Sequence, residues 1–287
     1  MKTNRFVMLG LAAALFQAVC GFGSANAQTP VCEPEKAAQK YPAYAGKVVK
    51  VAATPTYPPF TYTDSVDPRK LVGLEIELIE GVLNCAGLKY EYLLGAWGGL
   101  LPTLFSGASD VMVGNVNYRA DRAEKADFVV FMRNGTSVIV PKGNPKKVTD
   151  VDGLCGVTGS ANVGGSSALE IDRLSKACVA KGKPAINYLA SPDQEAAYRQ
   201  LLNGRIDFVM DGASSAAVRQ AVAPDFNIAF TMVTENVAGP VVLKGNATML
   251  NAIANGLKVM EQNGKLKALM VKYGMTEDLL VPVAIRN

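Results

Sequence analysis

Residues 114–128 read Gly-Asn-Val-Asn-Tyr-Arg-Ala-Asp-Arg-Ala-Glu-Lys-Ala-Asp-Phe. The apolar residues around their start predict a buried strand over 110–116, and the charged residues that follow predict one or two turns of helix. Open α/β sheets bind ligands outside the carboxyl ends of their strands. Asn115, Asn117 and Arg122 fall in this strand-to-helix turn. The stretch therefore predicts an anion site in an α/β fold.

The polar residues of this turn are spaced as Asn-x-Asn-x-x-x-x-Arg-x-x-x-x-Asp-Phe. The spacing resembles the corresponding turn of the family 3 periplasmic solute-binding proteins, which deliver amino acids to ABC importers. The resemblance implies that Arg122 binds a ligand carboxylate through two parallel hydrogen bonds. It also implies that Asn115 and Asn117 contact the same ligand.

Arg119 departs from the family pattern, which usually has Thr or Ser at this position. If its guanidinium faces the cleft, two arginines three residues apart need an anion beside them, and the ligand would carry more negative charge than a neutral amino acid. If it faces outward, it pairs with an acid such as Asp121 or Glu124 and has no bearing on the ligand. Both orientations stay open, and Arg119 is kept as a candidate ligand residue.

The N-terminus has the layout of a secretory signal peptide. Basic residues at 2 and 5 precede an apolar stretch from Phe6 to Val19, and Ala25-Asn-Ala27 forms an A-x-A cleavage site. We expect cleavage after Ala27 and a periplasmic protein. Lipidation of Cys20 is the alternative, which the poor lipobox Gln17-Ala-Val19 disfavours.

Composition excludes several functional classes. The chain of 287 residues is 49% hydrophobic and 19% charged, as globular proteins are, and after Ala27 it carries 27 basic and 25 acidic residues, a net charge of +2. This balance favours neither nucleic acid nor a membrane surface as a partner, and no later run is long and apolar enough to insert into a membrane. The chain has no His, which removes Ser-His-Asp and Cys-His catalysis. No metal site and no cofactor are expected.

Four cysteines follow the signal peptide, at positions 32, 85, 155 and 178. An even number in an exported chain predicts disulfides, although the sequence allows three pairings. We expect Cys155 to pair with Cys178, and Cys32 with Cys85. Each of these pairs joins the approach to a strand with the far end of the helix that returns beside it.

The first strand is predicted over Val48–Ala53, and the loop Thr54-Pro-Thr-Tyr-Pro-Pro-Phe60 that follows is stiffened by three prolines. This loop resembles the Tyr-x-Pro-Phe loop of the family, which implies that the ring of Tyr57 lies against the ligand. Thr54 stands where several family members carry an Asp that reaches a basic or amide side chain. The resemblance therefore disfavours a Lys or Arg ligand.

Two segments of the second half supply further candidates. A strand over 154–157 and a helix that ends at Cys178 flank a Gly- and Ser-rich turn, in which Gly159-Ser-Ala161 resembles the family's Gly-Thr-Thr. That resemblance implies that Ser160 meets the ligand carboxylate at a helix start. Gly204-Arg-Ile-Asp-Phe-Val-Met-Asp211 resembles the segment whose last Asp pairs with the ligand's ammonium group, which makes Asp211 the match.

The alternation of strands and helices predicts an α/β fold with mainly parallel sheets. Thr136–Pro141 and Val237–Lys244 are expected to be two strands that cross between two lobes, in an arrangement similar to type II periplasmic binding proteins. The first lobe would comprise residues 28–140 and 237–287, and the second 141–236. The tail after Tyr273 is expected to be irregular.

These features predict a periplasmic component of an ABC importer that binds an amino acid or a related small carboxylate between its lobes. A monomer that delivers its ligand to the transporter's permease is expected, and not an enzyme. One alternative is an enzyme that resembles cyclohexadienyl dehydratase and uses Asp211 or Glu75 as general acid. Another is a ligand-sensing accessory protein without a transporter. A dicarboxylate and a nonpolar amino acid both stay open as ligands.

Overall fold

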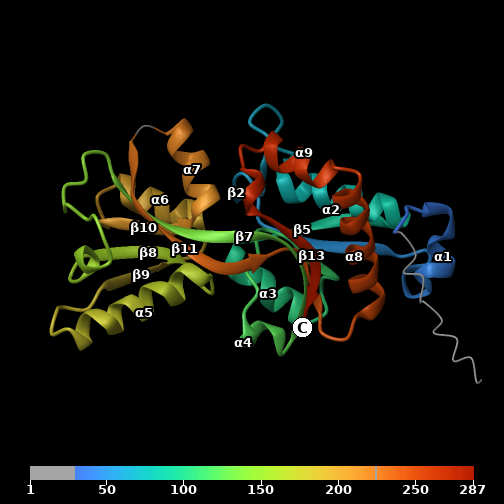
Figure 1. Ribbon diagram of the computed structural model, residues 1–287, viewed down its shortest axis with the longest axis horizontal. Helices are drawn as coiled ribbons and strands as arrows, with labels where there is room; N and C mark the ends of the chain where they lie inside the picture. The colour runs from blue at the N-terminus through green and yellow to red at the C-terminus, as the bar shows by residue number, and fades with distance from the viewer. Residues whose placement is uncertain (1–29, 224) are drawn as a thin grey trace, which may run out of the picture.

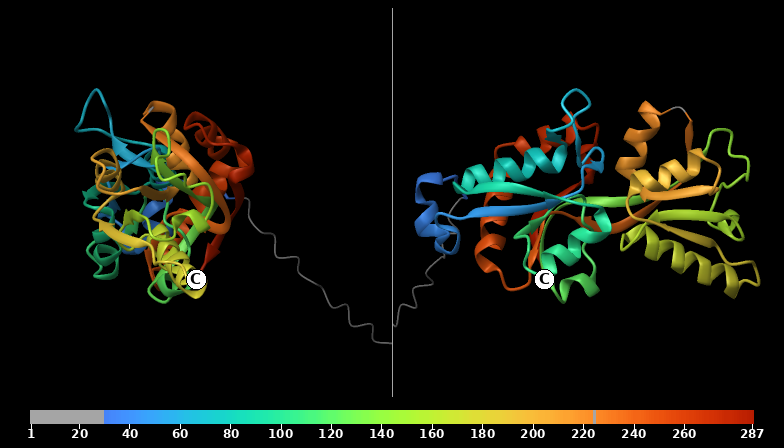
Figure 2. Two further views of the ribbon diagram at one scale, coloured as in Figure 1. Left: turned by 90° about the vertical axis from the view of Figure 1, so that its left-hand side faces the viewer. Right: turned by 180° about the vertical axis from the view of Figure 1, so that it is seen from behind.

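The computed structural model describes residues 30–223 and 225–287, so the predicted signal peptide and Cys20 lie outside the described residues. The chain forms two α/β lobes side by side, and strands β7 (Ala126–Pro141) and β11 (Phe226–Ala238) run through both of them (Figure 1). The right-hand view of Figure 2 shows the same division from behind. The predicted fold class is confirmed. In the described residues no helix is both long and apolar enough to cross a membrane.

The first lobe is built on β1 (Val48–Ala53), which pairs in parallel with β5 (Lys89–Leu94) and β6 (Val111–Met112). Alternate residues of its strands enter two separate cores, as the pleat of a strand requires. One core lies beneath α2 (Leu74–Ala86), α8 (Ala247–Gln262) and α9 (Lys265–Lys272), and the other beneath α3 (Trp97–Phe105). Smaller elements complete this lobe: α1 (Ala37–Lys40), β2 (Thr56–Tyr57), β3 (Thr61–Thr63), β4 (Leu71–Val72), α4 (Ala120–Ala123) and β12 (Val241–Leu243).

The second lobe repeats this plan with β10 (Phe208–Gly212), β8 (Thr158–Asn162) and β9 (Asn187–Ser191), which are parallel to one another. Helix α5 (Ser166–Ala180) covers one face, and α6 (Gln194–Leu202) and α7 (Ala213–Val222) cover the other. The prediction of a strand over 154–157 is wrong, because the strand is β8 and begins at Thr158. Leu154 instead ends a short 3-10 turn and is buried in the core.

The crossing strands differ from the prediction. The return crossing is β11, which shares only Val237 and Ala238 with the predicted strand Val237–Lys244, and most of that predicted strand is β12, which pairs with β6 and β7 inside the first lobe. β7 begins at Ala126, ten residues before the predicted start at Thr136, and pairs antiparallel with β12 in the first lobe and with β10 in the second. The tail is not irregular, because β13 (Leu280–Arg286) pairs antiparallel with β7. Parallel pairing is therefore confined to the body of each lobe, and antiparallel pairing joins the lobes.

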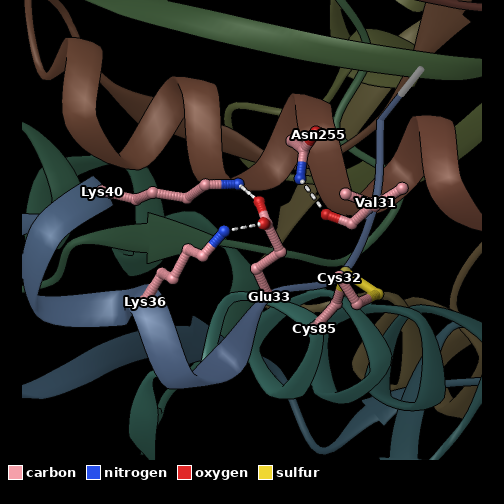
Figure 3. Close-up of polar contacts among 7 residues, drawn as sticks. All are labelled: Val31, Cys32, Glu33, Lys36, Lys40, Cys85 and Asn255. Carbon is pink, nitrogen blue, oxygen red and sulfur yellow. Dashed lines mark hydrogen bonds and ion pairs between the residues drawn. A yellow bond between two sulfur atoms is a disulfide. The ribbon is translucent and has the colours of Figure 1, made fainter. Parts of the chain in front are cut away.

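Both predicted disulfides are confirmed, Cys32–Cys85 and Cys155–Cys178. The first ties the N-terminal segment to the end of α2 (Figure 3). On the same segment the carbonyl of Val31 accepts a hydrogen bond from Asn255 of α8, and Glu33 pairs with two lysines of the following turn. The N-terminal segment is thus fixed to α2 and α8, two of the helices that cover the first lobe.

Candidate functional site

A cavity lies between the two lobes, where the crossing strands pass from one to the other. Its lining comes from both sides, and polar side chains dominate it. The first lobe and the crossing contribute Thr54, Thr56, Tyr57, Trp97, Asn115, Asn117, Arg122, Asn134, Gly135 and Thr136; the second lobe contributes Asn162, Gly165, Ser166, Ser167, Asp193, Gln194, Asp211 and Gly212.

Arg122 is a buried cation without an acidic partner among the described residues, and its relative exposure is 4%. Its Nη1 donates to the carbonyl of Asn117 at 2.8 Å and its Nη2 to the carbonyl of Gly164 at 2.7 Å. Its guanidinium carbon lies 5.4 Å from the centre of the Trp97 ring. Burial, assisted by the nearby charge of Arg119, lowers the pKa of Arg122 to about 10. Two neutral carbonyls do not balance its charge, so the site favours an anion.

Asp211 at the end of β10 is the opposite case, a buried acid at 2% exposure that forms no ion pair in the described part of the chain. The hydroxyl of Tyr198 donates to its Oδ2 at 3.1 Å, and that of Tyr57 to its Oδ1 at 3.3 Å. Burial raises the pKa of Asp211 above its ordinary value. A hydrogen bond from Ser215 and the charge of Arg219 lower this pKa in part, but Arg219 is itself paired with Glu195. A cationic group in the cavity would find a carboxylate here.

The start of α5 provides the second part of an anion site. Gly165, Ser166 and Ser167 line the cavity where this helix of 15 residues begins. The first N–H groups of a helix have no intrahelical partner, and together with the helix dipole they favour an anion. The Ser166 hydroxyl is buried and has no hydrogen-bond partner among the described residues. Because Arg122 is bonded to Gly164, its guanidinium lies next to this helix start.

The structure does not place Ser160 in the cavity. Ser160 lies inside β8, and its hydroxyl is bonded to the carbonyl of Leu189 and the hydroxyl of Ser191 on the neighbouring strand. The expected Gly-Ser pair at a helix start is instead Gly165-Ser166, six residues later. A second Gly-Ser sequence just before the apolar helix was the signal that could have identified it.

Arg119 does not line the cavity, although its side chain is only 20% exposed. Its side chain pairs with Asp121 through Nε, at 2.9 Å from Oδ1, and through Nη2. The pairing with an acid, the second of the two alternatives left open by the sequence, is therefore the one found, and Arg119 adds no cation to the site.

The other predicted residues meet in the cavity: Thr54, Tyr57, Asn115 and Asn117, with Arg122 and Asp211. Asn115 has a positive φ of 55° and is 4% exposed, and neither atom of its amide group has a partner in the described residues. Asn117 accepts a hydrogen bond from Asn134 at 2.9 Å, and the Thr54 hydroxyl is bonded to that of Thr56.

Sequence reasoning missed lining residues in β7 and at the start of α6. Asn134 and Thr136 were hidden inside an apolar crossing strand, where no motif marks them. Gln194 is 4% exposed, and its Nε2 donates to the carbonyl of Met210 at 3.3 Å. That carbonyl can only accept, so the unpartnered Oε1 of Gln194 is an acceptor at the cavity.

Two α/β lobes with a polar cavity between them are the arrangement expected of a solute-binding protein. The sequence model of the bacterial extracellular solute-binding proteins, family 3, matches residues 49–276, and the chain belongs to this family.

The L-cystine-binding protein TcyJ of Escherichia coli (strain K12) is 24% identical over 220 residues, which cover 76% of this chain and 79% of that protein. The cyclohexadienyl dehydratase of Pseudomonas aeruginosa is 21% identical over 181 residues, 62% of this chain and 64% of the enzyme. The L-arginine-bound structure of AbpA from Streptococcus pneumoniae superposes with a TM-score of 0.73, at 20% identity, and covers 81% of this chain and 97% of AbpA.

Proposed function

We propose that this protein is periplasmic, binds a free α-amino acid in the cavity between its lobes, and delivers it to the permease of an ABC importer. The observation that carries the proposal is the pairing of opposite unbalanced charges: Arg122 is a buried cation and Asp211 a buried anion on facing walls. Neither forms an ion pair within the described residues. A zwitterion compensates both.

The carboxylate of such a ligand would accept hydrogen bonds from Arg122 and from the first N–H groups of α5. Its ammonium group would donate to Asp211. Each charge-assisted contact contributes on the order of 1.5 to 3 kcal/mol where water is excluded. Because the anion site draws on both lobes, binding would favour the closed arrangement of the lobes.

The lining favours a ligand side chain that forms hydrogen bonds. Unpartnered polar atoms of Asn115, Asn134 and Gln194 border the cavity, whereas Trp97 and Tyr57 are its large apolar surfaces. A dicarboxylate would need a second cation, and Arg119 does not supply it. We therefore place amino acids with amide or hydroxyl side chains ahead of acidic and aliphatic ones.

We propose binding and not catalysis. Glu75, one of the two acids considered as a general acid, does not line the cavity. The other, Asp211, is held by two tyrosine hydroxyls and a backbone N–H, so it is placed as a fixed acceptor. We further propose that the signal peptide is removed on export to the periplasm. The mature protein is then a monomer that docks on the permease.

The test is a thermal-shift screen of the protein without residues 1–27 against the twenty common L-amino acids, L-cystine and small organic acids. A ligand that binds only the native state raises the melting temperature by mass action. A specific rise for an α-amino acid, lost when its carboxylate is replaced by an amide, supports the proposal. Equal stabilisation by compounds that lack an ammonium group contradicts it.

A further inference from the structure

Glu75 is a buried carboxylate that the binding proposal does not use. It is the second residue of α2 and is 0% exposed. Its Oε2 accepts hydrogen bonds from two consecutive backbone N–H groups, Gly114 at 2.5 Å and Asn115 at 3.0 Å. Its Oε1 has no partner among the described residues. Burying a charged carboxylate costs free energy, so the position of Glu75 is not explained by stability of the core.

The start of α2 fixes where this carboxylate lies. The N–H groups of Leu74 and Glu75 donate to the carbonyls of Pro59 and Phe60 at 2.8 and 3.0 Å. Gly73 has a φ of 130°, and a Cβ at this position would lie 2.3 Å from the carbonyl oxygen of Phe60. The helix therefore begins in direct contact with the loop that carries Tyr57, and Glu75 has little freedom to move.

The turn that Glu75 holds has an unusual backbone. Gly114 has a φ of 130° and Asn115 a φ of 55°, and the second value is in the left-handed region that few residues other than Gly, Asn and Asp adopt. This conformation directs both N–H groups at one oxygen atom. It also sets the direction of the Asn115 side chain, whose Nδ2 lies 3.4 Å from the position that a Cβ on Gly212 would take in the cavity.

We propose that Glu75 is a positioning residue of the binding cavity, whose ionised carboxylate holds the Gly114–Asn115 turn and thereby the Asn115 amide against the ligand. The effect on the turn stands on these contacts alone, and the effect on affinity rests on the proposed function. Protonation weakens one charge-assisted acceptor for both N–H groups at once and adds a buried O–H that needs an acceptor of its own.

The charge state of Glu75 follows from its surroundings. No lysine or arginine pairs with it in the described residues, and the titratable side chain that its charge affects is Tyr57, which is bonded to Asp211. Burial raises the pKa of Glu75 to about 7, and the two backbone hydrogen bonds oppose the rise. The turn is then held firmly above neutral pH and loosens below it.

The experiment follows the amide resonances of Gly114 and Asn115 by NMR in the ligand-free protein between pH 5.5 and 8.5. In wild type both should titrate together near neutral pH. In Glu75→Gln they should not titrate, and their hydrogen exchange at pH 8 should be at least tenfold faster than in wild type. Glu77→Gln is the matched control, because Glu77 is on the same helix but pairs with Lys272 at the surface. Unchanged exchange in Glu75→Gln overturns the proposal.

A second measurement separates the turn from the ligand. The affinities for L-glutamine, L-arginine and L-cystine are measured at pH 6 and pH 8. Any of these amino acids that binds should bind to wild type and to Glu77→Gln at least fivefold more tightly at pH 8 than at pH 6. The ratio of the two affinities should be smaller for Glu75→Gln. Equal ratios in wild type and Glu75→Gln overturn the link to affinity. If no α-amino acid of the thermal-shift screen binds while the amides titrate, the positioning role is supported and the proposed function is the part in error.

Discussion

Arg122 of the first lobe donates from Nη2 to the carbonyl oxygen of Gly164 in the second lobe, at 2.7 Å. Gly164 belongs to the turn that leads into α5, so the cation and the helix start that favour an anion are joined directly. Neither lobe alone contains the complete anion site. Separation of the lobes would break the bond and divide the site.

Replacing Arg122 with Ala should abolish binding of the amino acid selected by the thermal-shift screen while the fold survives. Its loss leaves a ligand carboxylate buried without a cation, which costs roughly 3 kcal/mol or more, at least a hundredfold in affinity. Isothermal titration calorimetry measures this. Arg119→Ala is the control, because Arg119 pairs with Asp121 outside the cavity and should bind within threefold of wild type.

Affinity should fall with pH as Asp211 is protonated. Its ionised form is the partner of the ammonium group, and burial raises the pKa of Asp211 above that of an ordinary aspartate. The contribution of Asp211 is therefore complete above this raised pKa and is lost as the pH falls through it. The comparison is made in the Glu75→Gln background, where Glu75 does not titrate, and there Asp211→Asn should bind weakly at every pH and lose this acid limb. A calorimetric series from pH 4 to pH 8 measures both proteins, and an identical acid limb in the mutant would contradict the assignment.

Gly212→Ala should weaken binding without weakening the fold. The backbone angles of Gly212, φ −57° and ψ 137°, are open to any residue. An added Cβ would lie 3.0 Å from the Tyr57 hydroxyl and 3.6 Å from Oδ1 of Asn134, inside the cavity. We expect at least a tenfold loss of affinity, about 1.4 kcal/mol, at an unchanged melting temperature. Gly99→Ala, where an added Cβ meets no atom within 4 Å, should leave affinity unchanged.

Removing the Cys155–Cys178 disulfide by replacing both residues with Ala should destabilise the second lobe. Its cysteines are 23 residues apart, and a cross-link over this length contributes about 3 kcal/mol. Cys178 also packs in the core with Ile171 and Leu174. Denaturant unfolding measures the difference, and a midpoint that does not change on replacement would show that the cross-link contributes nothing.

The residues that sequence could place in the site are those that follow buried strands or lie in a motif. Arg122 comes after the strand that ends near Met112, and Asp211 lies near the end of β10. Both stand where a parallel sheet presents its carboxyl edge, so the α/β pattern placed them correctly. Tyr57 followed the first strand in the same way.

Ser160 was wrongly predicted to lie in the turn after a strand, because the strand itself was predicted from hydrophobicity alone. Leu154–Val157 is the more apolar run, but the strand is Thr158–Asn162, which is polar and contains Gly159. A Cβ on Gly159 would lie 2.0 Å from the ring of Phe208 on the neighbouring strand, so only glycine allows these two strands to approach. This packing is a tertiary effect, which no local pattern records. The partner of β13 was equally hidden, because its pairing with β7 joins residues far apart in the sequence.

Asn134, Gly135 and Thr136 line the cavity and also lie within β7. Residues before them, such as Phe131, pack in the core of the first lobe, and Val138 and those after it pack in the cores of the second. The residues of β7 that lie between the cores of the two lobes are thus the same residues that line the cavity. A ligand that contacts these three residues therefore contacts one of the two strands that join the lobes. We expect ligands of different size to be bound with different angles between the lobes.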